Sequence, residues 1–291
     1  MTTPLAQRAS QRRRHVRQTF DRRVKEEWMR YEGEPRRALR HALRVRFLRR
    51  HLPRGAGTVL ELGPGPGRFT LELLRRTRGR VIAVDLSREG LRAARRRSRR
   101  GALAGRMDWV QGAGECLPIA SRSFDTAVVL GNIVSFAAAD GPVLLEELGR
   151  VVRPGGGLVV DFPTPAASVQ EFFHVAANRR YLRRVLRRPG YYLVDRVLAT
   201  GVQPLAPARM ARWEFRFYTV DQARKELAQA GFRTVDVMSV APIAAHQDRI
   251  AAIARRERRT WEGLLRIEEL VGRRVGTLET GHGFVLAAVR R

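Results

Sequence analysis

Hydrophobic and polar positions follow two alternating patterns over most of the chain. Short apolar runs, typical of buried strands, are separated by segments whose apolar residues recur every three or four positions, as on one face of a helix. The predicted strands are residues 59–62, 81–84, 107–110, 126–130, 158–161, 232–240 and 283–289. The predicted helices between them are residues 69–74, 88–100, 143–152, 219–230 and a long polar helix from 244 to about 270. Strands that alternate with helices at these intervals predict an α/β fold with a parallel, doubly wound sheet.

Two parts of the chain depart from this alternation. Residues 16–31, and again 35–52, carry apolar side chains at spacings of three and four, which predicts two amphipathic helices whose arginines lie mostly on the solvent face. The prolines of residues 163–215 interrupt any regular pattern. We therefore expect a basic N-terminal helical extension or cap over residues 1–57. A domain over residues 58–291 follows it, with a lid insertion at about 163–215 over the edge of the sheet.

The first predicted strand ends in a glycine-rich turn. Gly63, Gly65 and Gly67 occupy alternate positions, which permits a tight turn and lets backbone amides approach a ligand at a helix N-terminus. The dinucleotide pattern requires a further glycine three positions after its second one, and the two positions concerned hold Arg68 and Thr70. The turn therefore lacks the pyrophosphate fingerprint of dinucleotide-binding oxidoreductases.

A carboxylate stands at the end of the second predicted strand. Asp85 follows the apolar run of residues 81–84, where a carboxylate can accept hydrogen bonds from both hydroxyls of a ribose. An alternative role for Asp85 is to help cap the helix that begins after Ser87. Glu61 and the glycine pattern together favour the ribose role over the capping role.

These features together resemble the class I S-adenosylmethionine-dependent methyltransferases, in particular their small-molecule, methyltransferase type 11-like branch. The resemblance covers residues 59–163 well and 216–240 more loosely. It rests on VLELGPGPG, VIAVDLS, ECLPIASRSFDTAVV and ELGRVVRPGGGLVV, with RFYTVDQARKELAQAGF in support. It implies a Rossmann-like, mostly parallel seven-stranded sheet with helices on both faces, and S-adenosyl-L-methionine as the cofactor. We also expect a cytoplasmic enzyme, because a single cysteine makes a reducing compartment the default.

The resemblance also assigns roles by position. It implies that Glu61, with the backbone of Gly63 and Gly65, holds the methionine part of the cofactor, and that Asp85 holds the ribose. Asn132, after the fourth strand, should face the cofactor near its methyl group. The full set of expected cofactor-binding residues is Glu61, Gly63, Gly65, Gly67, Asp85, Leu86, Gly114, Glu115 and Asn132.

The adenine side departs from the family pattern. Leu86 should flank the adenine, but Ala113 stands where the family commonly has an aspartate that meets the adenine amino group. We expect Glu115 or the backbone of Gly114 to take over this contact, or else weaker adenine recognition. The glycines and Asp85 are retained, so the change does not imply a loss of cofactor binding.

The expected reaction is an in-line displacement at the sulfonium methyl group, and it requires no particular catalytic residue because positioning supplies most of the rate. His174 could act as a base near neutral pH or simply be a packed or surface residue. Tyr218 could orient a substrate or only pack against the next helix. Asp161 ends the fifth strand and either faces the pocket or accepts backbone hydrogen bonds. The histidines show no metal-ligand spacing, so no metal is expected.

Composition adds an unusual charge. The chain of 291 residues has 56 basic and 28 acidic side chains, a formal charge of +28, and 54 of the basic residues are arginine. Codon bias with arginines on solvent faces is one explanation, and a surface for nucleic acid, anionic lipid or an acidic substrate is another. The single cysteine, Cys116, excludes an internal disulfide framework. No secretory signal or transmembrane run is recognisable.

Three functions remain open at this stage. The favoured one is methyl transfer to a small-molecule acceptor, and the basic, aromatic lid suits an acceptor that is anionic, planar or amphipathic. An RNA methyltransferase is the second, but Gly131-Asn132-Ile133 follows the fourth strand where enzymes that methylate base amino groups have an Asn/Asp-Pro-Pro-aromatic motif. A non-catalytic nucleotide-binding protein is the third. The sequence does not determine the oligomeric state.

Overall fold

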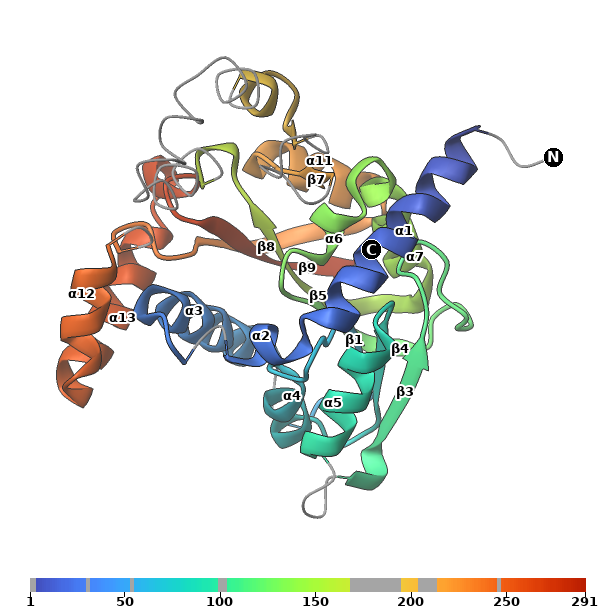
Figure 1. Cartoon of the computed structure of the whole chain (residues 1–291), viewed down its shortest axis with the longest axis horizontal. Coiled ribbons are helices and arrows are strands. Elements are labelled where there is room, and N and C mark those ends of the chain that lie inside the picture. The colour runs from blue at the N-terminus through green and yellow to red at the C-terminus, as the bar shows by residue number, and fades with distance from the viewer. Residues whose placement is uncertain are drawn as a thin grey trace.

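A computed structural model of the chain describes residues 4–29, 32–52, 55–98, 104–167, 195–203, 214–244 and 247–291 (Figure 1). Three helices come first: α1 (Pro4–Arg22), α2 (Val24–Met29) and α3 (Pro35–His51). The strands are β1 (Val59–Leu62), β2 (Val81–Asp85), β3 (Met107–Gln111), β4 (Phe124–Val129), β5 (Val152–Pro163), β6 (Val202–Gln203), β7 (Phe215–Arg216), β8 (Phe232–Ser239) and β9 (Gly283–Arg290). The other α-helices are α4 (Thr70–Arg76), α5 (Arg88–Ser98), α6 (Ile133–Phe136), α7 (Gly141–Val151), α11 (Val220–Gln229), α12 (Asp248–Arg255) and α13 (Arg258–Gly272).

Seven strands form the central sheet in the order β3-β2-β1-β4-β5-β9-β8. The first five strands along the chain pair in parallel, whereas β9 runs antiparallel to both of its neighbours, β5 and β8. This confirms the α/β class and the mostly parallel, seven-stranded arrangement. Because the parallel strands share one direction, the turns after β1, β2 and β4 meet at one edge of the sheet, where ligands bind in open α/β sheets.

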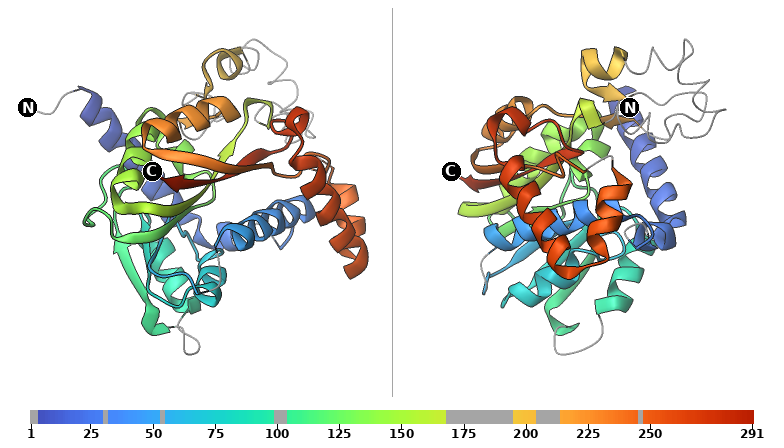
Figure 2. Two further views of the ribbon diagram at one scale, coloured as in Figure 1. Left: turned by 180° about the vertical axis from the view of Figure 1, so that it is seen from behind. Right: turned by 90° about the vertical axis from the view of Figure 1, so that its left-hand side faces the viewer.

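Helices cover both faces of the sheet (Figures 1 and 2). On one face the core contains Val134, Leu144, Leu148 and Leu227, which come from α6, α7 and α11. On the other face it contains side chains of α3, α4, α12 and α13, and Leu39, Leu43 and Phe47 of α3 are fully buried there. The third helix of the N-terminal segment is therefore part of the main core. The apolar stripe predicted for it from the sequence is the face that packs on the sheet.

Several local predictions were wrong. The long polar helix after residue 244 is two helices, α12 and α13, because Glu257 adopts an extended conformation between them (φ −128°, ψ 128°). The first helix begins at Pro4 rather than near Val16 and is separated from α2 at Arg23. The fifth strand begins at Val152 rather than near residue 158, so the glycines of residues 155–157 lie within β5, at an irregularity that separates the pairing of Val152 from that of Gly157.

Four of the seven arginines of α3 are at least partly exposed, as expected, but the other three are buried. Arg36, Arg40 and Arg44 are each less than a tenth exposed. They recur at a spacing of four, so they form a row beside the apolar stripe. Buried arginines require nearby polar or acidic partners, and the partner of Arg44 lies at the functional edge of the sheet, described below.

The predicted insertion is closed at its base. The backbone amide of Tyr218 donates to the carbonyl of Pro163 over 2.9 Å, and the short strands β6 and β7 pair antiparallel near the same place. Residues 168–194 and 204–213, which form most of the insertion, lie outside the described residues. Among the helices that the structure describes, none is both long and apolar enough to cross a membrane.

Candidate functional site

The turn after β1 presents backbone at the edge of the sheet. Gly63, Gly65 and Gly67 all have positive φ angles, of 72°, 51° and 93°, which glycine adopts without strain. A Cβ on Gly65 would meet no atom within 4 Å, so this residue faces open space, whereas a Cβ on Gly63 would collide with Ile133. A Cβ on Gly67 would lie 3.0 Å from the Cβ of Ala94 in α5. Gly65 is thus placed to approach a ligand, and the placement of Gly67 favours close packing against α5.

Asp85 organises this turn. One carboxylate oxygen accepts from the amide of Gly65 over 2.8 Å, and the other accepts from the amide of Ser87 over 2.7 Å. Ser87 caps the next helix, since its hydroxyl accepts from the amide of Gly90 over 2.9 Å. Each carboxylate oxygen has a second acceptor position. Burial raises the pKa of Asp85 to about 6, against the opposing effect of these backbone hydrogen bonds.

Glu61 lies within β1, below the turn. It is only 3% exposed, and its carboxylate accepts from the hydroxyl of Thr70 over 2.7 Å. Burial raises the pKa of Glu61 to about 8, and the neighbouring charge of Asp85 also raises it. An acidic group in this state is stabilised in its charged form by a nearby cation.

The turn after β4 lies beside the glycine-rich turn. Asn132 has a left-handed conformation (φ 63°, ψ 32°), which asparagine tolerates better than most residues. The amides of Gly131 and Asn132 donate to one oxygen of Asp161 over 2.9 and 2.8 Å, and Arg44 of α3 donates to the other over 2.6 Å. Of the two roles considered for Asp161, the structure shows the one that accepts backbone hydrogen bonds. The Oδ1 atom of Asn132 is buried and has no hydrogen-bond partner.

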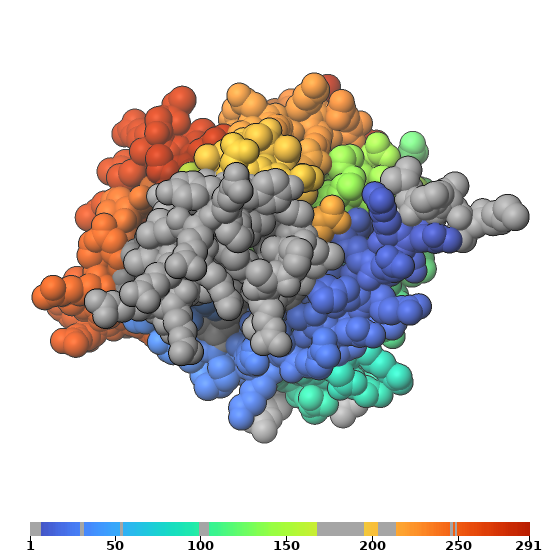
Figure 3. Space-filling model, turned by 45° about the horizontal axis from the view of Figure 1, so that its top comes forward, coloured from blue at the N-terminus to red at the C-terminus, as the bar shows by residue number. Residues whose placement is uncertain are grey.

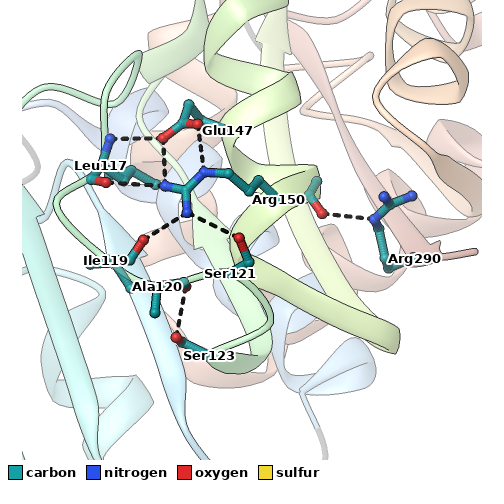
Figure 4. A network of polar contacts seen from close by, with 9 residues as sticks. Leu117, Ile119, Ala120, Ser121, Ser123, Glu147, Arg150 and Arg290 are labelled. Atoms are coloured by element: carbon teal, nitrogen blue, oxygen red, sulfur yellow. Dashed lines mark hydrogen bonds and ion pairs between the residues drawn. The ribbon is translucent and has the colours of Figure 1, made fainter.

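The segment expected on the adenine side is held by α7. Arg150 donates to the carbonyls of Leu117 and Ile119 over 3.1 and 2.7 Å, and Glu147 accepts from the amide of Leu117 over 2.9 Å (Figure 4). Just before this segment, a Cβ on Gly114 would lie 2.8 Å from Leu144, so Gly114 can offer only its backbone to a ligand. This network fixes the path of the chain at the position where the family aspartate is missing.

The first helix lies along the functional edge. Asp21 of α1 accepts from the hydroxyl of Ser87 over 2.7 Å and from the amide of Glu89 over 3.1 Å. Arg12, in the middle of α1, pairs with Asp140 and lies 3.6 Å from Glu115. Figure 3 shows α1, in blue, beside α5, in teal, on the surface of the molecule. The expected adenine contact Glu115 is therefore also a neighbour of the N-terminal segment.

Aromatic side chains from three segments meet next to Asn132. Phe136 ends α6, the helix that Asn132 begins, and its ring lies edge-on to Phe20 of α1 and to Phe215 of β7, with centroid distances of 5.2 and 4.9 Å. Phe215 in turn contacts Phe217 at 5.1 Å. A second contact holds α2, where Trp28 lies between the guanidinium groups of Arg68 and Arg97. The ring contacts of Phe136 with Phe20 and Phe215, and of Phe215 with Phe217, form an aromatic wall close to the turn after β4.

The two candidates for a catalytic role have different outcomes. His174 lies outside the described residues. Tyr218 is fully buried, packs against Phe162 at 4.8 Å and has its pKa raised by burial, so its placement favours the packing role. Leu86 follows Asp85 and is half-buried. In the part of the chain that the structure describes, no group of three His, Cys, Asp or Glu side chains could hold a metal ion.

Sequence reasoning did not identify several residues of this site. Arg44, Asp21 and Arg12 each come from the N-terminal segment and reach the edge of the sheet from far away in the chain. The spacing of four from Arg36 to Arg44 was a visible signal, because a basic row beside an apolar stripe indicates partial burial. Nothing in the sequence shows which acidic residue each arginine meets.

Comparisons with known proteins agree with this geometry. Residues 59–156 match the family model described as "Methyltransferase domain". The chain is 31% identical over 183 residues to the ubiquinone/menaquinone biosynthesis C-methyltransferase of Syntrophotalea carbinolica, a match covering 62% of this chain and 70% of that one. It is 34% identical over 109 residues to the enzyme of the same name from Dinoroseobacter shibae, where the match covers 37% of this chain and only 43% of the relative's length.

A solved structure shows the same fold over nearly the whole length. The S-adenosylmethionine-dependent methyltransferase of Thermotoga maritima superposes with a TM-score of 0.59 at 18% identity. The superposition covers 94% of this chain and 99% of that one. The likeness of fold therefore extends well beyond the segment that the family model matches.

Proposed function

The chain belongs to the class I S-adenosylmethionine-dependent methyltransferases, and from this premise we propose that it transfers a methyl group to a small acceptor molecule in the cytoplasm. The cofactor is S-adenosyl-L-methionine, as in the family. The acceptor, the residues that bind each substrate and the compartment are the proposed parts. The exposed, unpaired Cys116 supports a reducing compartment.

Four groups at the edge of the sheet fit the cofactor. The buried Oδ1 atom of Asn132, which has no partner, suits the methionine ammonium group. Burial keeps Glu61 protonated near neutral pH in the absence of a cation, and a bound ammonium group nearby would favour its charged form. The open space over Gly65 admits the ligand close to the backbone. Asp85, whose oxygens each accept one backbone hydrogen bond, can also accept from the ribose hydroxyls.

The cofactor supplies an electrophilic methyl group when it is bound, so the tasks of the protein are alignment and the exclusion of water. Asp161 fixes the turn after β4 through the amides of Gly131 and Asn132, and Arg44 holds Asp161. Helix α1 is tied to the turn after β2 by Asp21. We propose that residues 1–57 act with the insertion at 163–215 as the cover of this edge.

The aromatic wall next to Asn132 is the observation that carries the small-molecule assignment. Phe136 of α6, just after the turn that follows β4, contacts Phe20 from the N-terminal segment and Phe215 from the end of the insertion. A wall closed by three covering segments suits a compact planar or amphipathic acceptor, because a polynucleotide needs an open basic groove. The relatives named for quinone biosynthesis, which carry out C-methylation, also support a small acceptor.

The arginines of the N-terminal segment favour the same assignment over RNA. Arg12, Arg44 and Arg49 pair with Asp140, Asp161 and Glu72 of the methyltransferase core. Guanidinium groups held by internal carboxylates contribute little to the release of counterions from a nucleic acid backbone. These arginines therefore serve first to attach the proposed cover to the methyltransferase core.

The test is to follow a labelled methyl group. The protein is incubated with methyl-labelled S-adenosylmethionine and with separate RNA, protein and small-molecule extracts. We expect label in the small-molecule extract, including its lipid-soluble part, and at least tenfold less transfer by the Phe136→Ala variant with little change in cofactor affinity. Val143→Ala, an exposed residue of α7, is the matched control. Label in RNA, or none in any fraction from a protein that binds the cofactor, contradicts the proposal.

A further inference from the structure

The α12–α13 hairpin exposes an unusual amount of apolar surface. Ten large hydrophobic side chains are exposed in the described part of the chain, and six of them fall between residues 243 and 275. These six are Ile243, Ile250, Ile253, Ile267, Leu270 and Val275. Isolated exposed hydrophobic residues are common on soluble proteins, but a group of them on adjoining elements marks an interaction surface.

The exposed residues are placed on the helices in pairs. Ile250 and Ile253 are three residues apart on α12, and Ile267 and Leu270 are three apart on α13, so each pair shares one side of its helix. Ile253, Ile267 and Leu270 are 53%, 53% and 59% exposed. The opposite sides are already occupied, since Ala251 and Leu265 lie in the core with α3. The apolar residues are thus additional to those that fold the hairpin.

Exposed arginines lie on α12 and at the joined end of the hairpin. Residues 249–259 contain five arginines and one glutamate, and all five arginines are exposed. Arg249 lies at the start of α12, and the other four lie at the end of α12, in the connection and at the start of α13. The hairpin projects at one side of the molecule (Figure 1). Exposed isoleucine and leucine side chains flanked by arginines are typical of helices that lie in the interface of an anionic lipid bilayer.

The hairpin also adjoins the proposed cover. Arg255 donates to the carbonyl of Glu32 over 3.1 Å, which places the end of α12 next to the connection between α2 and α3. Met29, at the end of α2, is 48% exposed near this point. Arg68 of the glycine-rich turn in turn donates to the carbonyl of Glu27 over 3.4 Å. A partner that binds the hairpin would therefore lie on the side of the molecule that carries α2 and the glycine-rich turn.

We propose that the α12–α13 hairpin docks the protein on an anionic lipid surface, with its apolar side chains in the headgroup region and its arginines on lipid phosphates. Both kinds of contact are needed, because neither a short apolar stripe nor a few arginines binds a bilayer firmly alone. The proposal holds whatever the acceptor is, and it requires no transmembrane segment.

Vesicle co-sedimentation of the full chain tests the apolar part. Wild-type protein is mixed with vesicles of phosphatidylcholine, or of phosphatidylcholine with about a third phosphatidylglycerol. We expect binding to the anionic vesicles only. Ile267→Ser with Leu270→Ser should weaken that binding at least tenfold. The matched control, Val143→Ser with Leu198→Ser, removes equally exposed apolar residues elsewhere and should change binding less than twofold.

A second pair of variants tests the arginines. Arg256→Gln, Arg258→Gln and Arg259→Gln together should weaken binding more than about tenfold. Arg92→Gln, Arg95→Gln and Arg96→Gln remove the same charge from exposed positions of α5, which exposes no large hydrophobic residue among its described positions. This control should lose less than threefold. Equal losses in the two triple variants mean binding by net charge alone and overturn the proposal.

Hydrogen exchange provides a readout that does not depend on variants. Anionic vesicles should slow amide exchange in residues 248–272 and leave α7 and α11 unchanged. The proposal is overturned if wild-type protein does not bind anionic vesicles. It is also overturned if protection of the hairpin appears without vesicles as protein concentration rises, because the surface is then an interface between copies of this chain.

Discussion

Acidic residues behave in opposite ways at the proposed cofactor edge and in the elements of its proposed cover. At the edge, Glu61 and Asp85 accept from a hydroxyl and from backbone amides, and burial raises their pKa values to about 8 and about 6. Under the cover, the hydrogen bond from Arg49 lowers the pKa of Glu72. Strands β1, β2 and β4 contain no arginine, whereas α3 contains seven.

This difference has a physical explanation. An arginine at the edge would neutralise the acidic groups and compete with a positively charged ligand, so the edge leaves its carboxylates without a guanidinium partner. In the cover, the same guanidinium groups attach helices to the core. The arginines are thus concentrated in the proposed cover and are absent from the strands that end at the proposed ligand site. Glu115 lies within ion-pair distance of Arg12, and Asp161 is the fully buried exception, since it is at the edge and still pairs with Arg44.

The largest expected effect comes from this exception. Arg44 and Asp161 are 7% and 0% exposed, and removal of one partner from a buried pair leaves an uncompensated charge. Arg44→Met should lower the free energy of unfolding by about 3–5 kcal/mol, measured by urea denaturation. Arg80→Met, which breaks the exposed pair with Asp108, is the matched control. Asp161→Asn combined with Arg44→Met should recover part of the loss, and no recovery contradicts a charge effect.

Cofactor affinity should depend on Asp85 by the next largest amount. Asp85→Ala removes the acceptor of the Gly65 and Ser87 amides and the proposed ribose contact. We expect S-adenosylmethionine to bind at least tenfold more weakly in calorimetry, which corresponds to about 1.4 kcal/mol or more. Asp108→Ala, at the end of the sheet away from these turns, should leave the affinity unchanged. An unaltered affinity in Asp85→Ala would reject the assignment of this carboxylate.

Stability should fall as pH rises because of Glu61. Its pKa is about 8 when folded, above the ordinary 4.5, so the folded chain retains a proton that the unfolded chain releases. The stabilisation is complete below the ordinary pKa and is lost up to about pH 8, with a slope near 1.4 kcal/mol per pH unit. Burial lowers the pKa of His41 to about 4. Protonation of His41 therefore changes the free energy of unfolding with pH only below about pH 6.5.

The interval between about pH 6.5 and 8 therefore isolates Glu61. Urea denaturation at several pH values should show the slope in the wild type and its loss in Glu61→Gln. Glu89→Gln, on the exposed start of α5, should keep the wild-type slope. A slope that persists in Glu61→Gln would show that another group holds the proton.

The smallest effect is expected for the partly exposed pairs of the cover. Arg49 is 52% exposed where it meets Glu72, and solvent screens such pairs. Arg49→Gln should change the free energy of unfolding by less than about 1 kcal/mol. A loss as large as that of Arg44→Met would contradict the expected difference between buried ion pairs and pairs that solvent screens.

The repeating core of the fold could be predicted because it depends on local signals. The runs Val59–Leu62 and Val81–Asp85 are apolar enough to be buried on both sides, and Thr219 and Gly231 bound α11 in the expected way. The glycine-rich turn and Asp85 were identified because their chemistry depends on residues close in the chain. The two-helix hairpin at 248–272 was not predicted, since the break at Glu257 has no glycine or proline to mark it.

The sequence by itself determined the alternating α/β pattern, the glycine-rich turn and the carboxylate beside it, because burial periodicity and backbone freedom are local properties. Only the tertiary structure decided which arginine meets which carboxylate. Arg44 reaches Asp161 across 117 positions, and Arg12 reaches Asp140 across 128. Such pairings depend on how helices pack over the sheet, and no local pattern encodes that distance. Packing also decided which apolar residues remain outside the core. The α12–α13 hairpin therefore differs from the other arginine-rich surfaces in that it also exposes large apolar side chains.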